Sequence, residues 1–380
     1  MDSDRLELEA RRIICPFNGI DSAGIVKVSA GCIEQVVPTE GTVHPISGDL
    51  LLPGLVDLHC HIAPDQSVYG VAPDWILRSG TTTAASQGDA GAQTIEQFAS
   101  MSEKNPLSIK LAINLSAVGE STQAPCFSQV AWIDVRACIA AIKRYRDLIW
   151  AVSVNTSHHA CPKINPRSVL AAGIEVATET GLPVLYGMRR PEDWALADQL
   201  ALLREGDVVT YCFRQSPHCI MDNDQVLPCV LEARHRGVLF DVGHGCGSFD
   251  FDVAESAINA GFLPDTISTD LQIGHMAQET THDLPSVMYK LRAVGMPDAE
   301  IFKAATTAPA SLVGAVDRAK LSVGAFADFT VLSESEAELE LLDTSGKKRY
   351  SKVWTTAAVY VPVSYTHLRA HETDSYLVCR

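Results

Sequence analysis

The sequence lacks three features that would each indicate a different class of protein. No apolar run reaches the ~20 residues of a membrane-spanning helix, and the opening residues MDSDRLELEARR contain no apolar signal-peptide core. The 11 cysteines include no pair with CxxC spacing. We therefore expect a cytoplasmic protein with free, mostly buried thiols, and we expect no membrane partner.

Positive charge is scarce as well. The chain carries 30 Lys and Arg against 46 Asp and Glu, which gives a formal net charge of −16. Because binding to nucleic acid requires clustered Lys and Arg, this balance argues against a nucleic-acid partner. The 47% of hydrophobic residues among 380 is ample for a large core. A small-molecule substrate remains as the expected partner, and the oligomeric state stays open, including a homo-oligomer.

The middle of the chain alternates short apolar runs with helical patterns. No GxGxxG follows the first run, as a doubly wound dinucleotide-binding sheet would require, and this disfavours the alternative of an open sheet. Eight alternations favour an α/β fold, a closed (β/α)8 barrel of the TIM type, over residues 53–319. The eight expected strands are Leu55–His61, Thr81–Gly88, Ile109–Val118, Ile149–Thr156, Pro183–Met188, Asp207–Phe213, Leu239–Gly245 and Thr266–Leu271.

The helices between these runs have recognisable ends. Asn165 and Pro166 are typical of a helix start, and Gly181 of its end. Two further helices are predicted over Asp222–Arg236 and Phe251–Asn259.

Both ends of the chain read as short strands instead. We expect residues 1–52 and 320–363 to form one small β-rich domain beside the barrel. Its predicted strands are Arg12–Pro16, Gly24–Ser29, Cys32–Val37, Asp328–Leu332, Glu338–Leu342 and Val353–Val361. The last stretch, SYTHLRAHETDSYLVCR (residues 364–380), does not continue this pattern. We predict that it is a non-native tail, exposed and irregular.

Three potential metal ligands fall at expected strand ends. His59 and His61 close the first run, and side chains two apart on a strand point the same way. Asp270 closes the eighth run, which neighbours the first in a closed barrel. Two imidazoles and a carboxylate that leave positions open for water are typical of a catalytic Zn²⁺ or other divalent metal site. Asp270 could also act catalytically, as a proton shuttle.

The phrases PGLVDLHCH, GDVVTYCF, FDVGHGCGSFDF and AGFLPDTISTDL carry a family resemblance. The stretch from Ile46 to Leu332 resembles the amidohydrolase superfamily, in particular its bacterial deacetylase branch, often annotated dihydroorotase-like. The resemblance implies hydrolysis of an acetyl ester or amide and a site for two metals. It also implies a carboxylated Lys on strand four and a His on each of strands five and six. Here Ser153, Gly187 and Tyr211 occupy those positions, so we expect at most one ion.

Other polar residues follow the strands and could contact a substrate. His244 closes the seventh run among glycines that would let a ligand approach the backbone. Arg189 and Arg190 follow the fifth run and could hold a carboxylate. We therefore predict all three as substrate-binding residues.

Two hypotheses about function follow. In the first, the protein is a metal-dependent hydrolase of an amide or ester bond in a small molecule. In the second, it is a catalytically inactive barrel that still binds a small ligand or a protein partner. The retention of His59, His61 and Asp270 favours the first.

Overall fold

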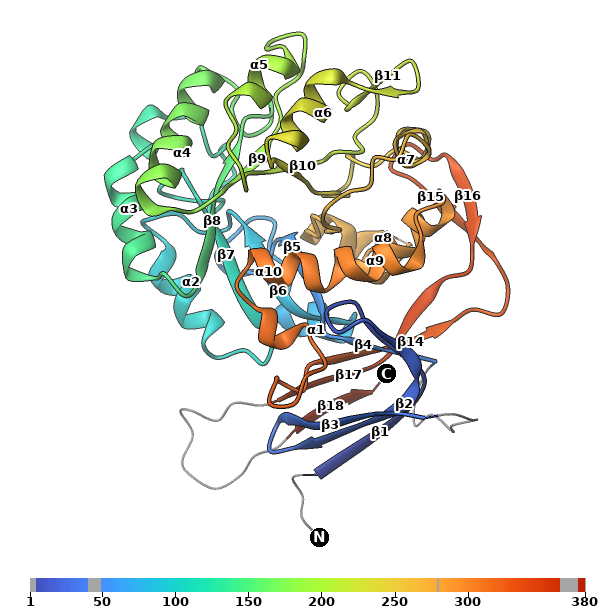
Figure 1. Ribbon diagram of the computed structural model, residues 1–380. Coiled ribbons are helices and arrows are strands. Elements are labelled where there is room, and N and C mark those ends of the chain that lie inside the picture. Colours follow the sequence, from blue (N-terminus) through green and yellow to red (C-terminus); the bar gives the residue numbers. More distant parts are fainter. Residues whose placement is uncertain (1–4, 40–48, 279, 363–374, 380) are drawn as a thin grey trace.

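The computed structural model describes residues 5–39, 49–278, 280–362 and 375–379. Its larger layer is a parallel sheet of seven strands, in the order β13-β10-β9-β8-β7-β6-β5, surrounded by helices (Figure 1). Most residues of these strands are buried on both faces, which accounts for the apolar runs in several of them. The strands are β5 (Leu55–Cys60), β6 (Thr81–Gln87), β7 (Ser108–Asn114), β8 (Ile149–Asn155), β9 (Val184–Gly187), β10 (Val208–Thr210) and β13 (Leu239–Phe240).

The eighth predicted strand closes the barrel without forming a regular strand. Thr266 makes a parallel bridge to Asp241, just beyond β13, and Leu271 makes one to Cys60 at the end of β5. The Asp57 carboxylate also accepts hydrogen bonds from the backbone N–H of Thr269 (3.2 Å) and its hydroxyl (2.5 Å). The segment between β13 and β5 therefore lies where the eighth strand of a (β/α)8 barrel belongs, and the predicted fold class is confirmed.

Helices cover the outside of the barrel, and two of them begin and end as their sequences predict. The helix α4 follows its cap Asn165, whose side chain accepts from the N–H of Arg167, and ends at Gly181 with φ of 66°. In α7, Asp250 caps the first turn in the same manner. The helices are α1 (Pro73–Arg78), α2 (Ile95–Ser102), α3 (Val135–Arg144), α4 (Pro166–Thr180), α5 (Leu196–Ala201), α6 (Pro228–His235), α7 (Phe251–Asn259), α8 (Leu284–Ala293), α9 (Asp298–Ala305), α10 (Thr307–Leu312), η1 (Val130–Trp132), η2 (Ile273–Ala277) and η3 (Val316–Arg318).

The prediction of one helix over Asp222–Arg236 was wrong in its first half. There a short hairpin of β11 (Met221–Asp222) and β12 (Gln225–Val226) precedes α6. Asn223 and Asp224 turn the hairpin with φ of 47° and 58°, values that a helix cannot accommodate.

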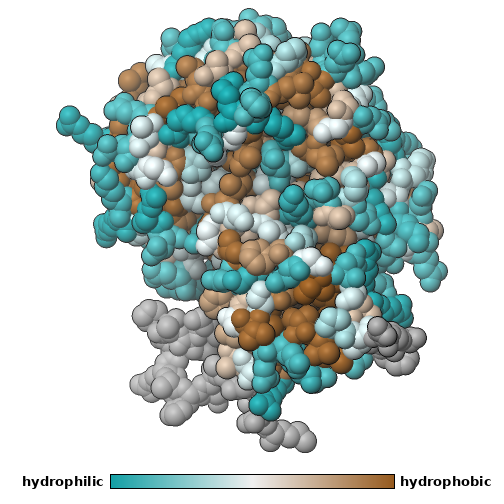
Figure 2. Space-filling view, viewed as in Figure 1, coloured by the Kyte–Doolittle hydropathy of each residue, from teal (hydrophilic) through white to brown (hydrophobic). Residues whose placement is uncertain are grey.

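The two ends of the chain form one sheet beneath the barrel, in the order β18-β17-β14-β4-β1-β2-β3 (Figure 1). This sheet has a hydrophobic cluster of its own, while other side chains of its strands, such as Leu52 and Val361, belong to the main cluster that includes the barrel core. In Figure 2, hydrophobic and hydrophilic residues are mixed over both the barrel and this lower sheet. The strands are β1 (Arg5–Cys15), β2 (Ile20–Ser29), β3 (Cys32–Pro38), β4 (Leu50–Pro53), β14 (Phe329–Glu334), β17 (Trp354–Pro362) and β18 (Ser375–Cys379).

Two details of the C-terminal part differ from expectation. The predicted strand at Glu338–Leu342 pairs in a separate hairpin, β15 (Leu339–Leu342) with β16 (Lys348–Ser351), outside the small sheet. The tail was expected to be irregular throughout, yet β18 pairs antiparallel with β17. Residues 364–374 of that tail lie outside the described residues. Among the described residues, no helix is long and apolar enough to cross a membrane.

Candidate metal centre

Two imidazoles converge on one carboxylate at the carboxyl end of β5. Asp270 Oδ1 lies 3.3 Å from Nε2 of His59 and 3.3 Å from Nε2 of His61. All three side chains are buried. Asp270 Oδ1 therefore lies between the two predicted imidazole ligands, and the nitrogen that faces it is the same on both rings.

The opposite ring nitrogens are held by the protein. His59 Nδ1 lies 2.8 Å from the hydroxyl of Thr210, which itself donates to Asp241 at 2.8 Å. His61 Nδ1 lies 2.8 Å from Asp89 Oδ1. When each ring is neutral with its Nδ1 proton directed toward these acceptors, each Nε2 presents a lone pair. Such outer partners orient imidazoles that bind metals, so these residues fit a divalent ion.

The charges of the cluster are strongly coupled. Burial opposes a charge on His59, but Asp270 and Asp241 together raise the pKa of His59 to about 9. Burial likewise opposes ionisation of Asp270, but the two imidazoles hold its pKa well below its ordinary value. Asp270 is therefore ionised, the state in which a carboxylate can bind a cation or accept a proton.

The backbone at Asp270 is strained. Its φ is 47°, a left-handed value that non-glycine residues seldom adopt. Gly245 makes room for this carboxylate, because a Cβ there would lie 2.4 Å from Asp270 Oδ2. Strain of this kind persists where the surrounding structure holds a functional group in place.

A second arrangement surrounds the other side of His61. Its Nδ1, Asp89 and Glu120 offer ligand atoms within 4.8 Å of one another, a spacing that could hold an ion. However, Asp89 already accepts from the N–H of Ile62 and the hydroxyl of Ser86, each at 2.7 Å. This carboxylate is thus saturated as a support for His61, and we favour the Nε2 side of the ring as the metal side.

A cavity of about 410 Å³ opens above the cluster, a size suited to a small molecule. Its lining comes from several strand ends and loops, as expected for the carboxyl face of a barrel. The residues that line it are His61, Tyr69, Gln87, Glu120, Asn155, Ser157, His159, Tyr211, Arg214, Cys246, Gly247, Ser248, Asp270 and Gln272.

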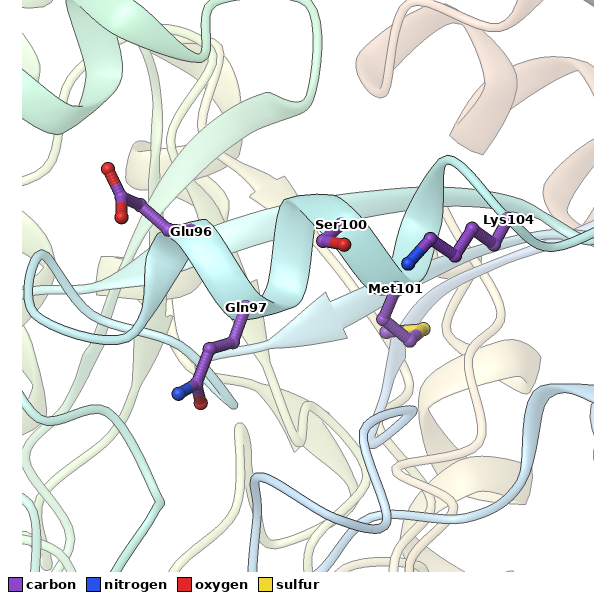
Figure 3. A pocket seen from close by; sticks show the side chains of 5 residues that line it. All are labelled: Glu96, Gln97, Ser100, Met101 and Lys104. Carbon is purple, nitrogen blue, oxygen red and sulfur yellow. The ribbon is translucent and has the colours of Figure 1, made fainter. Parts of the chain in front are cut away.

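Another hollow, of about 420 Å³, lies along α2. Figure 3 shows its five lining side chains, Glu96, Gln97, Ser100, Met101 and Lys104, all of which come from α2 and the turn that follows it. Groups from different elements do not converge there as they do in the barrel mouth. We therefore place the functional site in the mouth.

Three known proteins are similar to this chain in sequence. A protein of Brucella anthropi named deacetylase is 32% identical over 333 residues, which cover 83% of this chain and 82% of that protein. Another deacetylase, from Agrobacterium fabrum, is 32% identical over 305 residues (79% and 74%). A third, from Enterococcus faecalis, is 29% identical over 316 residues (82% and 85%). No profile of a known protein family matches the chain.

Two solved structures have a fold similar to that of this chain. A dihydroorotase superposes with a TM-score of 0.85 at 27% identity, covering 94% of this chain and 96% of that protein. An adenine deaminase gives 0.84 at 25% identity (93% and 97%). The chain belongs to the amidohydrolase superfamily. This confirms the resemblance drawn from the sequence and places the protein among the hydrolases, beside bacterial deacetylases.

This amidohydrolase has neutral groups where the resemblance implies further metal ligands. Ser153, at the end of β8, accepts a hydrogen bond from Gln87 at 3.1 Å. Gly187 ends β9 beside Asn155, and a Cβ on that glycine would lie 2.7 Å from the Asn155 Oδ1. Tyr211 follows β10, buried, with its hydroxyl 3.5 Å from His59 Nε2. Burial and nearby Asp270 raise the pKa of this phenol well above its ordinary value, so it stays neutral.

The residues predicted to bind substrate lie elsewhere. His244 is buried behind the cavity, stacked on Phe249, with Nε2 3.0 Å from Lys290 Nζ. Arg189 donates to Asp193 (3.0 Å) and to two backbone carbonyls, and so braces loops. Arg190 is exposed. None of the three lines the cavity, so the geometry gives no support to their predicted roles.

Sequence reasoning identified His61, Tyr211 and Asp270 but missed several other groups that line the cavity. Arg214 extends over the ring of Tyr211 at 4.5 Å and donates to Ser248 at 3.1 Å. Glu120 and Tyr69 line the cavity from loops. Asp89 was identifiable in principle, since it follows the second strand as Asp270 follows the eighth. Loop residues such as Glu120 carry no comparable signal of position.

Proposed function

We propose that the protein is a metal-dependent hydrolase that removes an acyl group, most simply acetyl, from an ester or amide of a small molecule. One divalent ion, Zn²⁺ or a similar metal, would be held by His59, His61 and Asp270. The observation that carries this proposal is the convergence of two braced imidazole Nε2 atoms on Asp270 Oδ1. The names of the relatives support the acyl group, and the cavity supports a small substrate.

The bound ion would supply Lewis acidity, which lowers the pKa of water and polarises a carbonyl. The chain supplies the rest. Thr210 and Asp89 fix the imidazoles, and the cavity walls keep the substrate against the cluster. Asp270 is ionised and lies at the reaction point, so it can accept a proton from the attacking water. It can then return that proton to the departing alcohol or amine.

We propose one bound ion and not two, because the groups on the other side of the mouth are neutral. Neither Ser153 nor Gly187 offers an imidazole or a Lys carbamate, and the neutral Tyr211 is a poor ligand for zinc. The ten cysteines between residues 5 and 362 are free thiols, in keeping with the cytoplasmic location expected from the sequence.

The test begins with protein stripped by a chelator and reloaded with Zn²⁺ or Mn²⁺. We expect hydrolysis of N-acetyl or O-acetyl model compounds to depend on the added metal. His59→Ala should abolish both metal retention and turnover, because the remaining pair cannot fix the geometry. His235→Ala is the matched control, since that imidazole is exposed at the end of α6. Ligand binding in the mouth without any turnover, with metal present, would support the inactive barrel instead.

A further inference from the structure

Tyr211 occupies an unusual position for a bulky residue. Its φ is 68°, a left-handed value that costs energy for any side chain with a Cβ. The ring meets His59 edge to face, with centroids 5.2 Å apart, and is almost fully buried at 5% exposure. The strained backbone therefore aims the phenol at the metal cluster, while the same residue lines the cavity.

The hydroxyl of Tyr211 makes only a long hydrogen-bond contact among the described residues. Among the described residues, its one recorded hydrogen-bond contact is His59 Nε2, at a long 3.5 Å. That nitrogen is the atom by which His59 would bind an ion. With the nitrogen so engaged, the phenol is a buried donor that faces the cavity and needs an acceptor.

Arg214 lies behind the ring. Its guanidinium is 4.5 Å from the ring centroid and donates to the Ser248 hydroxyl at 3.1 Å. Among the described residues no carboxylate forms a recorded ion pair with it. A cation over the ring withdraws electron density from the phenol, so the O–H becomes a stronger donor. Arg214 thus both packs the ring and favours hydrogen bonding by its hydroxyl.

We propose that the Tyr211 hydroxyl donates a hydrogen bond to the carbonyl oxygen of the scissile acyl group. It would thereby supply electrophilic assistance on the side of the mouth where Ser153 and Gly187 offer no ligand. This inference rests on the proposed hydrolysis. Tyr211 is a catalytic residue in this account, and Arg214 is a positioning residue that acts through it.

The step balances without a further reactant. Water oxygen bonds to the carbonyl carbon, and the π electrons move to the carbonyl oxygen, where the hydrogen bond from Tyr211 strengthens. Asp270 accepts the proton from water. The bond to the alcohol or amine then breaks, and the leaving group takes that proton, which releases the acid.

The experiment compares Tyr211→Phe with wild type and with Tyr289→Phe, a control phenol on α8 outside the cavity. Loss of one such donor is expected to lower kcat for an acetyl ester about 100–1,000-fold while KM changes little. Zinc content should stay the same as in wild type. An unchanged kcat, or a loss of zinc that accounts for the loss of turnover, would overturn the proposal.

A binding measurement gives a readout that does not depend on turnover. Methylphosphonate resembles the tetrahedral intermediate, whereas acetate resembles the planar acid. In zinc-loaded protein, Tyr211→Phe should weaken methylphosphonate at least about 10-fold and acetate much less, because the donor matches the developing oxyanion. Equal losses for both ligands would contradict the inference.

Different results would contradict the proposed hydrolysis and the proposed role of Tyr211. If wild type hydrolyses no acetyl compound, the proposed function fails, yet the methylphosphonate titration still decides whether Tyr211 binds an oxyanion. If wild type and Tyr211→Phe are equally active, only this inference fails. Arg214→Lys should keep part of the methylphosphonate affinity that Arg214→Met loses, since it keeps a cation near the ring.

Discussion

The two sides of the barrel mouth differ in what their strand ends carry. On one side, which we call the retained side, His59, His61 and Asp270 form a charged cluster. On the altered side, Ser153, Gly187 and Tyr211 end three neighbouring strands with neutral groups. Both sides are buried, so exposure does not explain the difference. We propose the retained side as the one that holds a cation, because its groups are imidazoles and a carboxylate.

The residues that contact these strand-end groups also differ between the two sides. Asp241 lies under His59 and accepts from three hydroxyls, those of Thr210 (2.8 Å), Thr266 (2.7 Å) and Ser268 (2.6 Å). On the altered side, Asn155 fills the space that a side chain at position 187 would need. The retained side therefore has a hydrogen-bonded support beneath its imidazole, whereas the altered side is a packed polar wall.

The largest effect should come from the support of His61. Asp89→Asn should lower zinc affinity about 10–100-fold, because it weakens the acceptor that fixes the metal-binding tautomer. Glu120→Gln is the matched control, since its carboxylate also faces Nδ1 of His61, at 3.1 Å. Competition with a chromophoric chelator measures both. If Glu120→Gln lowers the affinity as much as Asp89→Asn, the ion binds on the Nδ1 side and the retained side is wrongly assigned.

The packing of the altered side predicts an effect on stability. Gly187→Ala should reduce the free energy of unfolding by about 1–3 kcal/mol, since the new methyl would overlap Asn155. Gly274→Ala is the control, because a Cβ there has no atom within 4 Å. Urea denaturation compares the two. Equal stability would mean that Asn155 moves freely and that the wall is not packed.

Two half-buried cations, one on each side of the mouth, should respond differently to pH. Arg214, on the altered side, stays charged because a guanidinium does not lose its proton near neutral pH. Lys290 contacts His244 beyond the retained side, and burial lowers its pKa to about 8. The ordinary value is 10.5, so between the two values the unfolded chain binds more protons. The contribution of Lys290 to stability therefore rises as pH rises from 8 to 10.5.

We expect the free energy of unfolding to rise by about 1 kcal/mol over this pH range. This is less than the whole pKa difference would give, because water partly screens the half-exposed side chain. Lys290→Met should remove this rise, while Lys303→Met, an exposed lysine of α9, should not. Urea denaturation at pH 7.5 and 9.5 tests both variants. The same pH response in wild type and Lys290→Met would show that Lys290 is charged throughout.

Much of this architecture could be predicted from the sequence. Apolar runs located most strands, caps located α4, and the helix from Phe251 to Asn259 has the predicted bounds. His59, His61 and Asp270 were found because each ends a run, which placed them at one edge of the sheet. Such reasoning depends only on strand period and barrel closure, both of which are local or topological.

Side-chain direction could not be predicted in this way. His244 also ends a run, but its ring turns inward to Phe249 and Lys290. Arg189 follows a run as well, yet nearby carbonyls capture its guanidinium. Arg214 reaches the cavity from a loop whose path depends on the whole fold. Position along a strand is encoded locally, whereas the partner of a long side chain is decided by tertiary packing.

The central claim is that only the retained side holds metal, and the number of ions per chain tests it most directly. Protein saturated with Zn²⁺ and then passed over a desalting column should contain one ion per chain by elemental analysis. His59→Ala, treated alike, should contain none. Two ions per chain in the wild type would contradict the account, because the altered side would then be a metal site. No bound ion at all would contradict the assignment of His59, His61 and Asp270.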